Sequence, residues 1–232
     1  MIFTSSWDDG SSADLKLADI LLEYKIKGTF YIPIQWKYRT MVDNDLKKIS
    51  KKFEIGSHSF SHKNMTKLNS NNLSDELLKS KNALKKITKT KVKCFAYPFG
   101  KFNDRVASSV KKSGYIYART SDEFQTHFPE NPFNSGVSIS VTNRPRRALL
   151  TYGLILSLKN NWVYYKWDSI AKELLMRCIK ENGIFHLHGH SWEIEKEHSW
   201  DALRKFFDFV SKLDSIEFMT NQELASYHSD TI

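Results

Sequence analysis

The first thirty residues constrain the fold more than any other part of the chain, because they alternate between strand and helix patterns. The apolar opening at residues 1–3 is typical of a strand, and residues 14–24 carry apolar side chains at helical spacing. Residues 29–32 then form a second strand of β-branched and aromatic residues. A strand, a helix and a strand in this space predict a βαβ unit, and therefore a parallel sheet.

The alternation continues to the end of the chain. Helices are predicted at residues 43–52, 74–87, 103–112, 169–180 and 200–213, with Ser74 as an N-cap, and strands at residues 53–57, 92–96, 115–118, 183–188 and 216–218. Residues 121–147 are expected to form an irregular loop. These elements predict a single domain over residues 1–232, built as a doubly wound parallel sheet or as an α/β barrel.

The composition limits the classes of binding partner and the cell compartment that we expect for the protein. A net charge of +9 and a pI near 9.3 favour an anionic partner, yet the scattered lysines and the lack of an arginine-rich arm argue against nucleic acid. Cys94 and Cys178 lie between apolar residues and are predicted to be buried thiols. The chain starts without a leader pattern, and its longest apolar run, residues 148–158, is too short to span a bilayer. We therefore expect a cytoplasmic protein.

Polar residues of catalytic type gather where the predicted strands end. They are Asp8 and Asp9, His58 and His62, the turn at residues 97–100, Arg119, and the three histidines His186, His188 and His190. In both candidate folds the chemistry lies beyond the C-terminal ends of the strands. An Asp-Asp-Gly sequence alone is also common in turns. Its recurrence with other such residues at several strand ends favours an active site.

The histidine pair predicts a metal site. His58 and His62 are four residues apart directly after a strand, so their rings face the same side if the turn is helical. Such a pair suits zinc, with a carboxylate as third ligand and water at an open position. Asp8 or Asp9 can supply that carboxylate, while the other accepts a proton from the water. The alternative is a pair of surface histidines in a polar loop.

Four segments resemble the motifs of the polysaccharide deacetylases, also called the NodB-homology group or carbohydrate esterase family four. They are Ser6-Trp7-Asp8-Asp9-Gly10, His58-Ser59-Phe60-Ser61-His62, Ala96-Tyr97-Pro98-Phe99-Gly100 and Leu187-His188. The first two motifs are the specific ones, and the likeness runs from residue 3 to about residue 220. This resemblance implies a distorted (β/α) barrel of about seven parallel strands.

The resemblance also implies roles for the site residues. Asp8 would be the general base, and Asp9, His58 and His62 would hold a divalent metal. Zinc suits these ligands best, although cobalt, nickel, manganese or iron could replace it. The backbone N–H of Phe99 would donate to the oxyanion, with Tyr97 and Trp192 lining the substrate pocket. The substrate would be an N-acetylated or, less often, an O-acetylated sugar.

Two departures from the family pattern leave questions open. Ala96 stands where the family carries an arginine that orients the base, and we predict that Arg119 takes over this role; a solvated charge at a strand end is the alternative. Three histidines compete for the role of general acid. The distance from Gly183 favours His188, whereas relatives that read His-Leu-Trp-Gly-His-Ser point to His186 or His190.

The identity of the substrate is left open among several classes. A polysaccharide, an oligosaccharide or a nucleotide-linked or lipid-linked precursor would fit, and the positive charge suits a diphosphate. Arg144, Arg146 and Arg147 could grip that diphosphate, touch an anionic membrane surface, or form only a basic loop. Trp162, Tyr164, Tyr165 and Trp167 could stack on sugars or belong to the core. Hydrolysis of a ureide or imide, and an inactive sugar-binding module, are the alternative functions.

Overall fold

The sheet is entirely parallel and curls around β1. The computed structural model describes residues 1–142 and 166–230. Its strands are β1 (Ile2–Asp8), β2 (Thr29–Ile32), β3 (Glu54–Ser57), β4 (Cys94–Ala96), β5 (Tyr117–Arg119), β6 (Ile139–Ser140), β7 (Ile184–Gly189) and β8 (Glu217–Met219). They follow the order β5-β4-β3-β2-β1-β7-β6, while β8 pairs with the N-terminal half of β1. The predicted distorted (β/α) barrel of about seven strands is confirmed.

A short irregular segment brings the two edges of the sheet together. Ser135 bonds to Ala118 and Thr120 beside β5, and Ser138 and Val141 donate to carbonyls of β7. Residues 135–141 therefore bridge the open side of the barrel. This stretch was predicted to be irregular throughout, and β6 within it was not expected.

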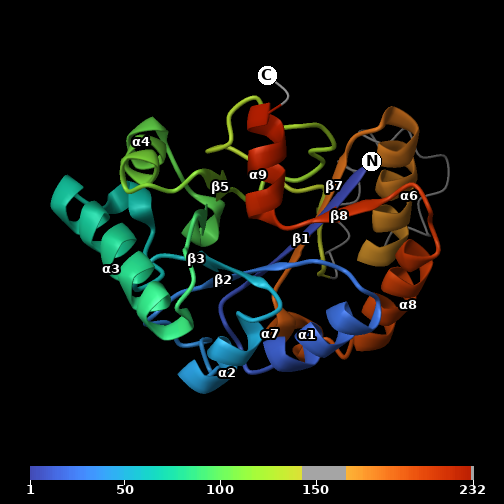
Figure 1. Ribbon diagram of the computed structural model, residues 1–232, viewed down its shortest axis with the longest axis horizontal. Helices are drawn as coiled ribbons and strands as arrows, with labels where there is room; N and C mark the ends of the chain where they lie inside the picture. The colour runs from blue at the N-terminus through green and yellow to red at the C-terminus, as the bar shows by residue number, and fades with distance from the viewer. Residues whose placement is uncertain (143–165, 231–232) are drawn as a thin grey trace.

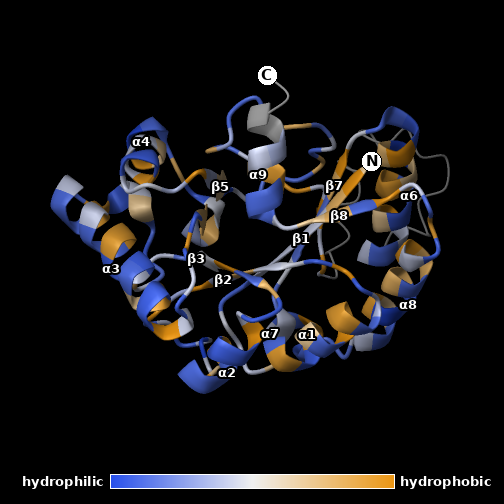
Figure 2. Ribbon diagram, in the orientation of Figure 1, coloured by the Kyte–Doolittle hydropathy of each residue, from blue (hydrophilic) through white to orange (hydrophobic). Residues whose placement is uncertain are grey.

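Helices cover the curled sheet, most of them on its outside and the last one across an end of the barrel (Figure 1). They are α1 (Asp14–Glu23), α2 (Asp43–Ile49), α3 (Ser70–Thr88), α4 (Asp104–Lys112), α6 (Trp167–Glu181), α7 (Ser191–Lys196), α8 (Trp200–Ser211) and α9 (Asn221–Asp230), with short 3₁₀ turns at Met65–Lys67 and Pro98–Gly100. Figure 2 shows hydrophobic and hydrophilic residues side by side around these helices, as expected for helices with one face on a core.

Alternation along β1 separates two apolar regions. Phe3 and Trp7 point to the helical layer and join the main core, which also contains Leu21 and Phe206. A smaller cluster fills the N-terminal end of the barrel interior, and its members are Ile2, Tyr31, Cys94, Ala96, Tyr117, Ile184, Met219 and Leu224. The C-terminal end of the interior is left for polar residues.

Several sequence predictions need correction. Helix α3 begins at Ser70 rather than at Ser74, because the side chain of Asn69 accepts a hydrogen bond from the Asn72 N–H and caps the helix there. Trp167 starts α6 and is buried against Phe206, with ring centroids 5.5 Å apart, so it is a core residue and does not stack on sugars.

The two thiols are as the sequence predicts, and several other predicted features fall outside the described residues. Cys94 and Cys178 are buried free thiols, as predicted. The run at residues 148–158, the three arginines before it, and Trp162, Tyr164 and Tyr165 lie outside the described residues. In the part of the chain that is described, no helix has both the length and the apolar character that a membrane crossing needs.

Candidate active site

Two adjacent carboxylates lie at the C-terminal end of β1. Asp8 is the last residue of the strand, and Asp9 and Gly10 both adopt positive φ angles, 80° and 65°. This left-handed turn bends the chain so that both carboxylates face the same pocket. Only 3% of each residue is exposed to solvent. The turn that is typical of an Asp-Asp-Gly sequence thus includes Asp9 itself.

The pocket has a volume of about 310 Å³ and collects residues from most strand ends. It is lined by Asp8, Asp9, Trp36, Tyr38, His58, His62, Tyr97, Phe99, Gly100, Arg119, Ser121, His188, His190 and Trp192. All the predicted site residues except His186 are in this set. Sequence reasoning missed Trp36 and Tyr38, although two aromatic residues directly after the second strand were a usable signal.

Asp9, His58 and His62 offer three ligand atoms that lie within 4.8 Å of one another. The Nε2 atoms of the two histidines are 3.1 Å apart, and Asp9 Oδ1 is 3.4 Å from Nε2 of His62. The turn between the histidines is not helical, because Ser59 and His62 have positive φ angles. The rings converge nevertheless, with the Ser59 hydroxyl accepting a hydrogen bond from the His62 N–H.

The chemistry of these donors fits a divalent metal. His58 Nδ1 lies 2.8 Å from the carbonyl oxygen of Ala96, so Nδ1 carries the proton and Nε2 presents its lone pair to the pocket. Among the described residues, nothing donates a hydrogen bond to the buried Oδ1 of Asp9. A buried carboxylate oxygen without a donor is costly, and a bound cation would satisfy it.

Asp8 is held by Arg119. The buried guanidinium donates from Nη2 to Asp8 Oδ1. Ala96 and Arg119 are register partners on neighbouring strands, so the arginine reaches the carboxylate from one strand further along the sheet. Burial raises the pKa of Asp8, but the charge of Arg119 together with the contacts to His58 and His188 outweighs it and holds this pKa well below its ordinary value.

The three late histidines have different surroundings. His188 Nε2 lies 3.3 Å from Asp8 Oδ2, and its Nδ1 is hydrogen-bonded to the Ser140 hydroxyl at 3.0 Å. His190 Nδ1 bonds to Glu193 Oε2 at 2.9 Å, and its Nε2 lies 3.9 Å from Asp9 Oδ2. Burial lowers the pKa of His188 to about 4.

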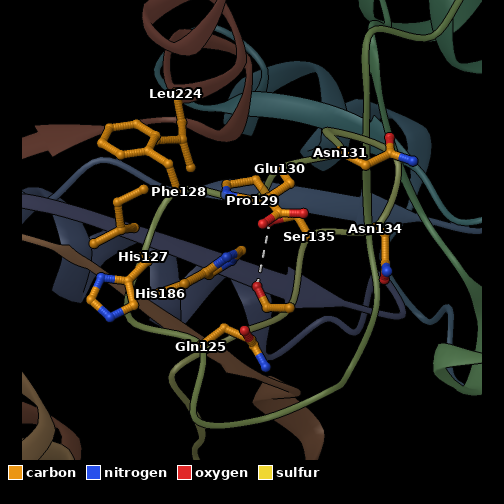
Figure 3. A pocket seen from close by; sticks show the side chains of 12 residues that line it. Gln125, His127, Phe128, Pro129, Glu130, Asn131, Asn134, Ser135, His186 and Leu224 are labelled. Atoms are coloured by element: carbon orange, nitrogen blue, oxygen red, sulfur yellow. Dashed lines mark hydrogen bonds between the residues drawn. The ribbon is translucent and has the colours of Figure 1, made fainter.

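His186 belongs to a separate cavity. Its Nε2 is 2.9 Å from the hydroxyl of Ser6, and it lines a pocket of about 380 Å³ together with Phe128, Glu130 and Asn134 (Figure 3). None of the metal-binding candidates lines this second pocket. The structure therefore brings His188 and His190 to the carboxylates and keeps His186 apart from them.

Aromatic rings line the pocket around the candidate metal ligands Asp9, His58 and His62. Trp36 stacks on His62 with centroids 4.1 Å apart, and Trp192 stacks on Tyr38 at 4.4 Å. The Trp192 indole also donates to Asp9 Oδ2 at 3.0 Å, which leaves Oδ1 of this carboxylate facing the histidines. The ring of Phe99 is exposed beside His62.

The turn after β4 presents a backbone donor. Phe99 has a positive φ of 60°, and no described residue accepts a hydrogen bond from its N–H. Tyr97 is fixed instead, because its N–H donates to the Arg119 carbonyl and its hydroxyl donates to the Phe133 carbonyl. Tyr97 thus stabilises the turn, while Phe99 faces the pocket.

A parallel barrel with two carboxylates and four histidines in a pocket at its strand ends defines a barrel protein with a candidate metal-hydrolase site. The family follows from the sequence: the family model described as polysaccharide deacetylase matches residues 2–118, half of the chain, and the protein belongs to this family. The uncharacterized protein YlxY of Bacillus subtilis (strain 168) is 35% identical over 95 residues, which make up 39% of this chain and 28% of that relative.

Solved structures share the fold over nearly the whole chain. A family 4 acetyl xylan esterase from Clostridium thermocellum, in complex with a cobalt ion, has a TM-score of 0.65 and 16% identity, covering 99% of this chain and 92% of its own. The Xyl-CE4 domain of a multidomain xylanase from the hindgut metagenome of Trinervitermes trinervoides has a TM-score of 0.64 and 16% identity, covering 98% and 91%. At these identities the likeness concerns the fold.

Proposed function

We propose that this chain is a single-domain, metal-dependent hydrolase that removes the acetyl group from an N-acetylated sugar. Membership of the polysaccharide deacetylase family supports the reaction class. The observation that carries the proposal is the meeting of two groups in one pocket: Asp9, His58 and His62 as metal ligands, and Asp8 with its arginine as a base. Zinc is the metal best suited to one carboxylate and two imidazoles.

The two carboxylates divide the chemistry. A divalent metal bound by Asp9, His58 and His62 would supply Lewis acidity and lower the pKa of water beside it. Asp8 accepts the proton of the attacking water on Oδ2, because Arg119 occupies Oδ1. The low pKa of Asp8 keeps this carboxylate ionised for the task.

The leaving group and the oxyanion need donors. Water attacks the acetyl carbon, the C–N bond breaks, and the departing nitrogen takes a proton to become an amine. We assign this proton to Nε2 of His188, which lies 3.3 Å from Asp8 Oδ2 and passes on the proton that this carboxylate takes from the water. The unpartnered N–H of Phe99 donates to the developing oxyanion. The products are acetate and the free amino sugar.

The shape of the pocket supports a sugar as substrate. Trp36, Tyr38 and Phe99 place aromatic rings at the rim of a cavity of about 310 Å³, which suits the apolar face of one sugar residue. The sugar can belong to a polysaccharide, an oligosaccharide or a diphosphate-linked precursor, and the net charge of +9 favours the last. A precursor of this kind accords with the expected cytoplasmic location and peripheral membrane contact.

Acetate release tests the proposal. Purified protein is supplied with zinc and assayed against nucleotide-linked sugars, lipid-linked sugars and N-acetylated oligosaccharides. We expect acetate from at least one class, loss of activity in a chelator, and recovery when zinc is restored. Asp8→Asn should retain the metal and lose turnover, whereas His62→Ala should lose turnover together with tight metal binding. Turnover of ureides or imides without acetate would favour the other hydrolase, and bound sugar without any turnover would favour a binding module.

A further inference from the structure

A second set of ligand atoms lies directly beside the first, since Asp8 Oδ2 is 3.6 Å from His58 Nε2 and His190 Nε2 is 3.9 Å from Asp9 Oδ2. Asp8, His188 and His190 offer one carboxylate oxygen and two imidazole nitrogens, all within 4.8 Å of one another. This set shares no residue with Asp9, His58 and His62. In the proposed function His190 has neither a ligand role nor an acid role, so its place beside the base needs another explanation.

Both imidazoles are oriented as metal ligands are. His188 is hydrogen-bonded through Nδ1 to the Ser140 hydroxyl, and His190 through Nδ1 to the Glu193 carboxylate. A histidine that binds a metal through one ring nitrogen nearly always uses the other for such an outer contact, which fixes the tautomer and the ring plane. His58 is held in the same way by the Ala96 carbonyl.

One oxygen of the Asp8 carboxylate is not bound by Arg119. Arg119 binds Oδ1, while Oδ2 lies 3.3 Å from Nε2 of His188. Oδ2 itself is buried, but it lines the open pocket, and the side chain of His190 in the same set is 25% exposed to solvent. An ion can therefore reach Oδ2 and two imidazole nitrogens without displacing the arginine.

Charge makes this second position weaker than the first. The guanidinium of Arg119 and an ion held by Asp9 both repel a further cation. The carboxylates of Asp8 and Glu193 offset part of this repulsion. We therefore expect binding only after the first site is filled.

We propose that Asp8, His188 and His190 form a second, weaker site for a divalent transition metal such as zinc or cobalt, and that an ion bound there inhibits deacetylation. The inhibition rests on the proposed function, in which Asp8 is the base and His188 the acid. A metal at the second site occupies the lone pairs that these groups use to accept and deliver protons.

Cobalt titration of the metal-free protein tests the number of sites. Equilibrium dialysis with Co²⁺, followed by its visible absorption, should give two equivalents for the wild type, one tight and one weak. His190→Ala should keep only the tight one, and His62→Ala only the weak one. Glu193→Gln, which leaves the ligands in place, should weaken the second equivalent by about tenfold or more. His127→Ala, an exposed histidine outside the pocket, is the matched control and should bind two equivalents.

Activity completes the test. Acetate release by the wild type should rise through the first equivalent of cobalt and fall through the second. The fall should be absent in His190→Ala and should move to about tenfold higher cobalt in Glu193→Gln. A single equivalent in a wild type that still releases acetate would overturn the second site and leave the proposed function standing. Two equivalents in His190→Ala, or an unchanged second affinity in Glu193→Gln, would also overturn it. Failure to bind any metal would sink both proposals.

Discussion

Arg119 reaches Asp8 from the strand next to the one that carries Ala96. The two residues are paired in register, so a side chain from either position enters the same part of the barrel. Ala96 is fully buried and small, which leaves space for the guanidinium from β5. The cation that supports the base can thus come from a neighbouring strand without a change in the base itself.

Arg119→Ala should lower kcat by about a hundredfold or more, because Asp8 would lose the group that orients it and keeps its pKa low. Metal content should stay near that of the wild type. The measurement is kcat for acetate release, with Arg105→Ala as an exposed control. The double variant Ala96→Arg/Arg119→Ala should recover part of the lost rate, since it returns a guanidinium to the paired position. A kcat of the Arg119→Ala variant within a few-fold of the wild-type value would show that Arg119 has no role in the mechanism.

Asp14 is a buried acid outside the pocket lining. It lies in the first turn of α1, and the hydroxyl of Ser191 is close enough to lower its pKa without offsetting its burial. Burial, reinforced by the negative charge of Asp9, raises the pKa of Asp14 from 3.8 to about 8. Between these two values the folded protein binds more protons than the unfolded chain, so the free energy of unfolding must fall as the pH rises.

Asp14→Asn should remove this pH dependence. In metal-free protein, the free energy of unfolding of the wild type should fall by about 2–3 kcal/mol between pH 6 and pH 9 relative to the variant. Urea titrations of both proteins across this range provide the comparison. Asp19→Asn, on the solvent face of the same helix, is the control. Parallel curves for the wild type and Asp14→Asn would show that Asp14 is already ionised at neutral pH.

At the scale of elements, the long amphipathic helices and buried strands could be predicted, whereas elements created by tertiary pairing could not. β6 has two residues and exists because Ser140 pairs with His188. The start of α9 did carry a local signal: Thr220 and Glu223 form a reciprocal capping box, with each side chain accepting from the other's backbone N–H.

The residue types of the site could be predicted from the sequence, but their geometry could be predicted only in part. Strand-end position was enough to bring Asp9 and His62 together. Choosing among the late histidines required three-dimensional information. His186 and His188 share a face of β7, but two residues along a strand span about 6.6 Å, so His186 lies one layer deeper and bonds to Ser6.

The contact between β2 and β3 depends on Gly56. A Cβ atom at this position would lie 2.4 Å from the ring of Tyr31 and 3.2 Å from the Cys94 carbonyl oxygen. Gly56→Ala should therefore lower the free energy of unfolding by about 1–3 kcal/mol. Denaturant titration measures this loss. In a Tyr31→Leu background the loss should shrink, and an equal loss in both backgrounds would show that the ring is not the obstacle.

The two ends of the barrel have different roles, one in the candidate active site and the other in holding the elements together. The C-terminal ends of the strands hold the carboxylates and histidines of the pocket, while α9 contacts β1, β5 and β8 at the other end (Figure 1). Asn221, the first residue of α9, joins the elements there. Its side-chain NH₂ group donates to the Thr4 hydroxyl at 2.9 Å, and its side-chain oxygen accepts from the Tyr31 hydroxyl at 2.7 Å. Its backbone N–H donates to the Thr29 hydroxyl at 3.0 Å.

This separation predicts that stability can be lost without loss of the metal site. Asn221→Ala leaves the buried hydroxyls of Tyr31 and Thr4 without their partner, which should cost roughly 2–4 kcal/mol and lower Tm by roughly 5–15 °C. Asn72→Ala, on the exposed face of α3, should change Tm little. Zinc affinity of the folded variant at low temperature should match that of the wild type, because none of the proposed ligands contacts Asn221. A large drop in zinc affinity would instead mean that the closed end of the barrel controls the geometry of the pocket.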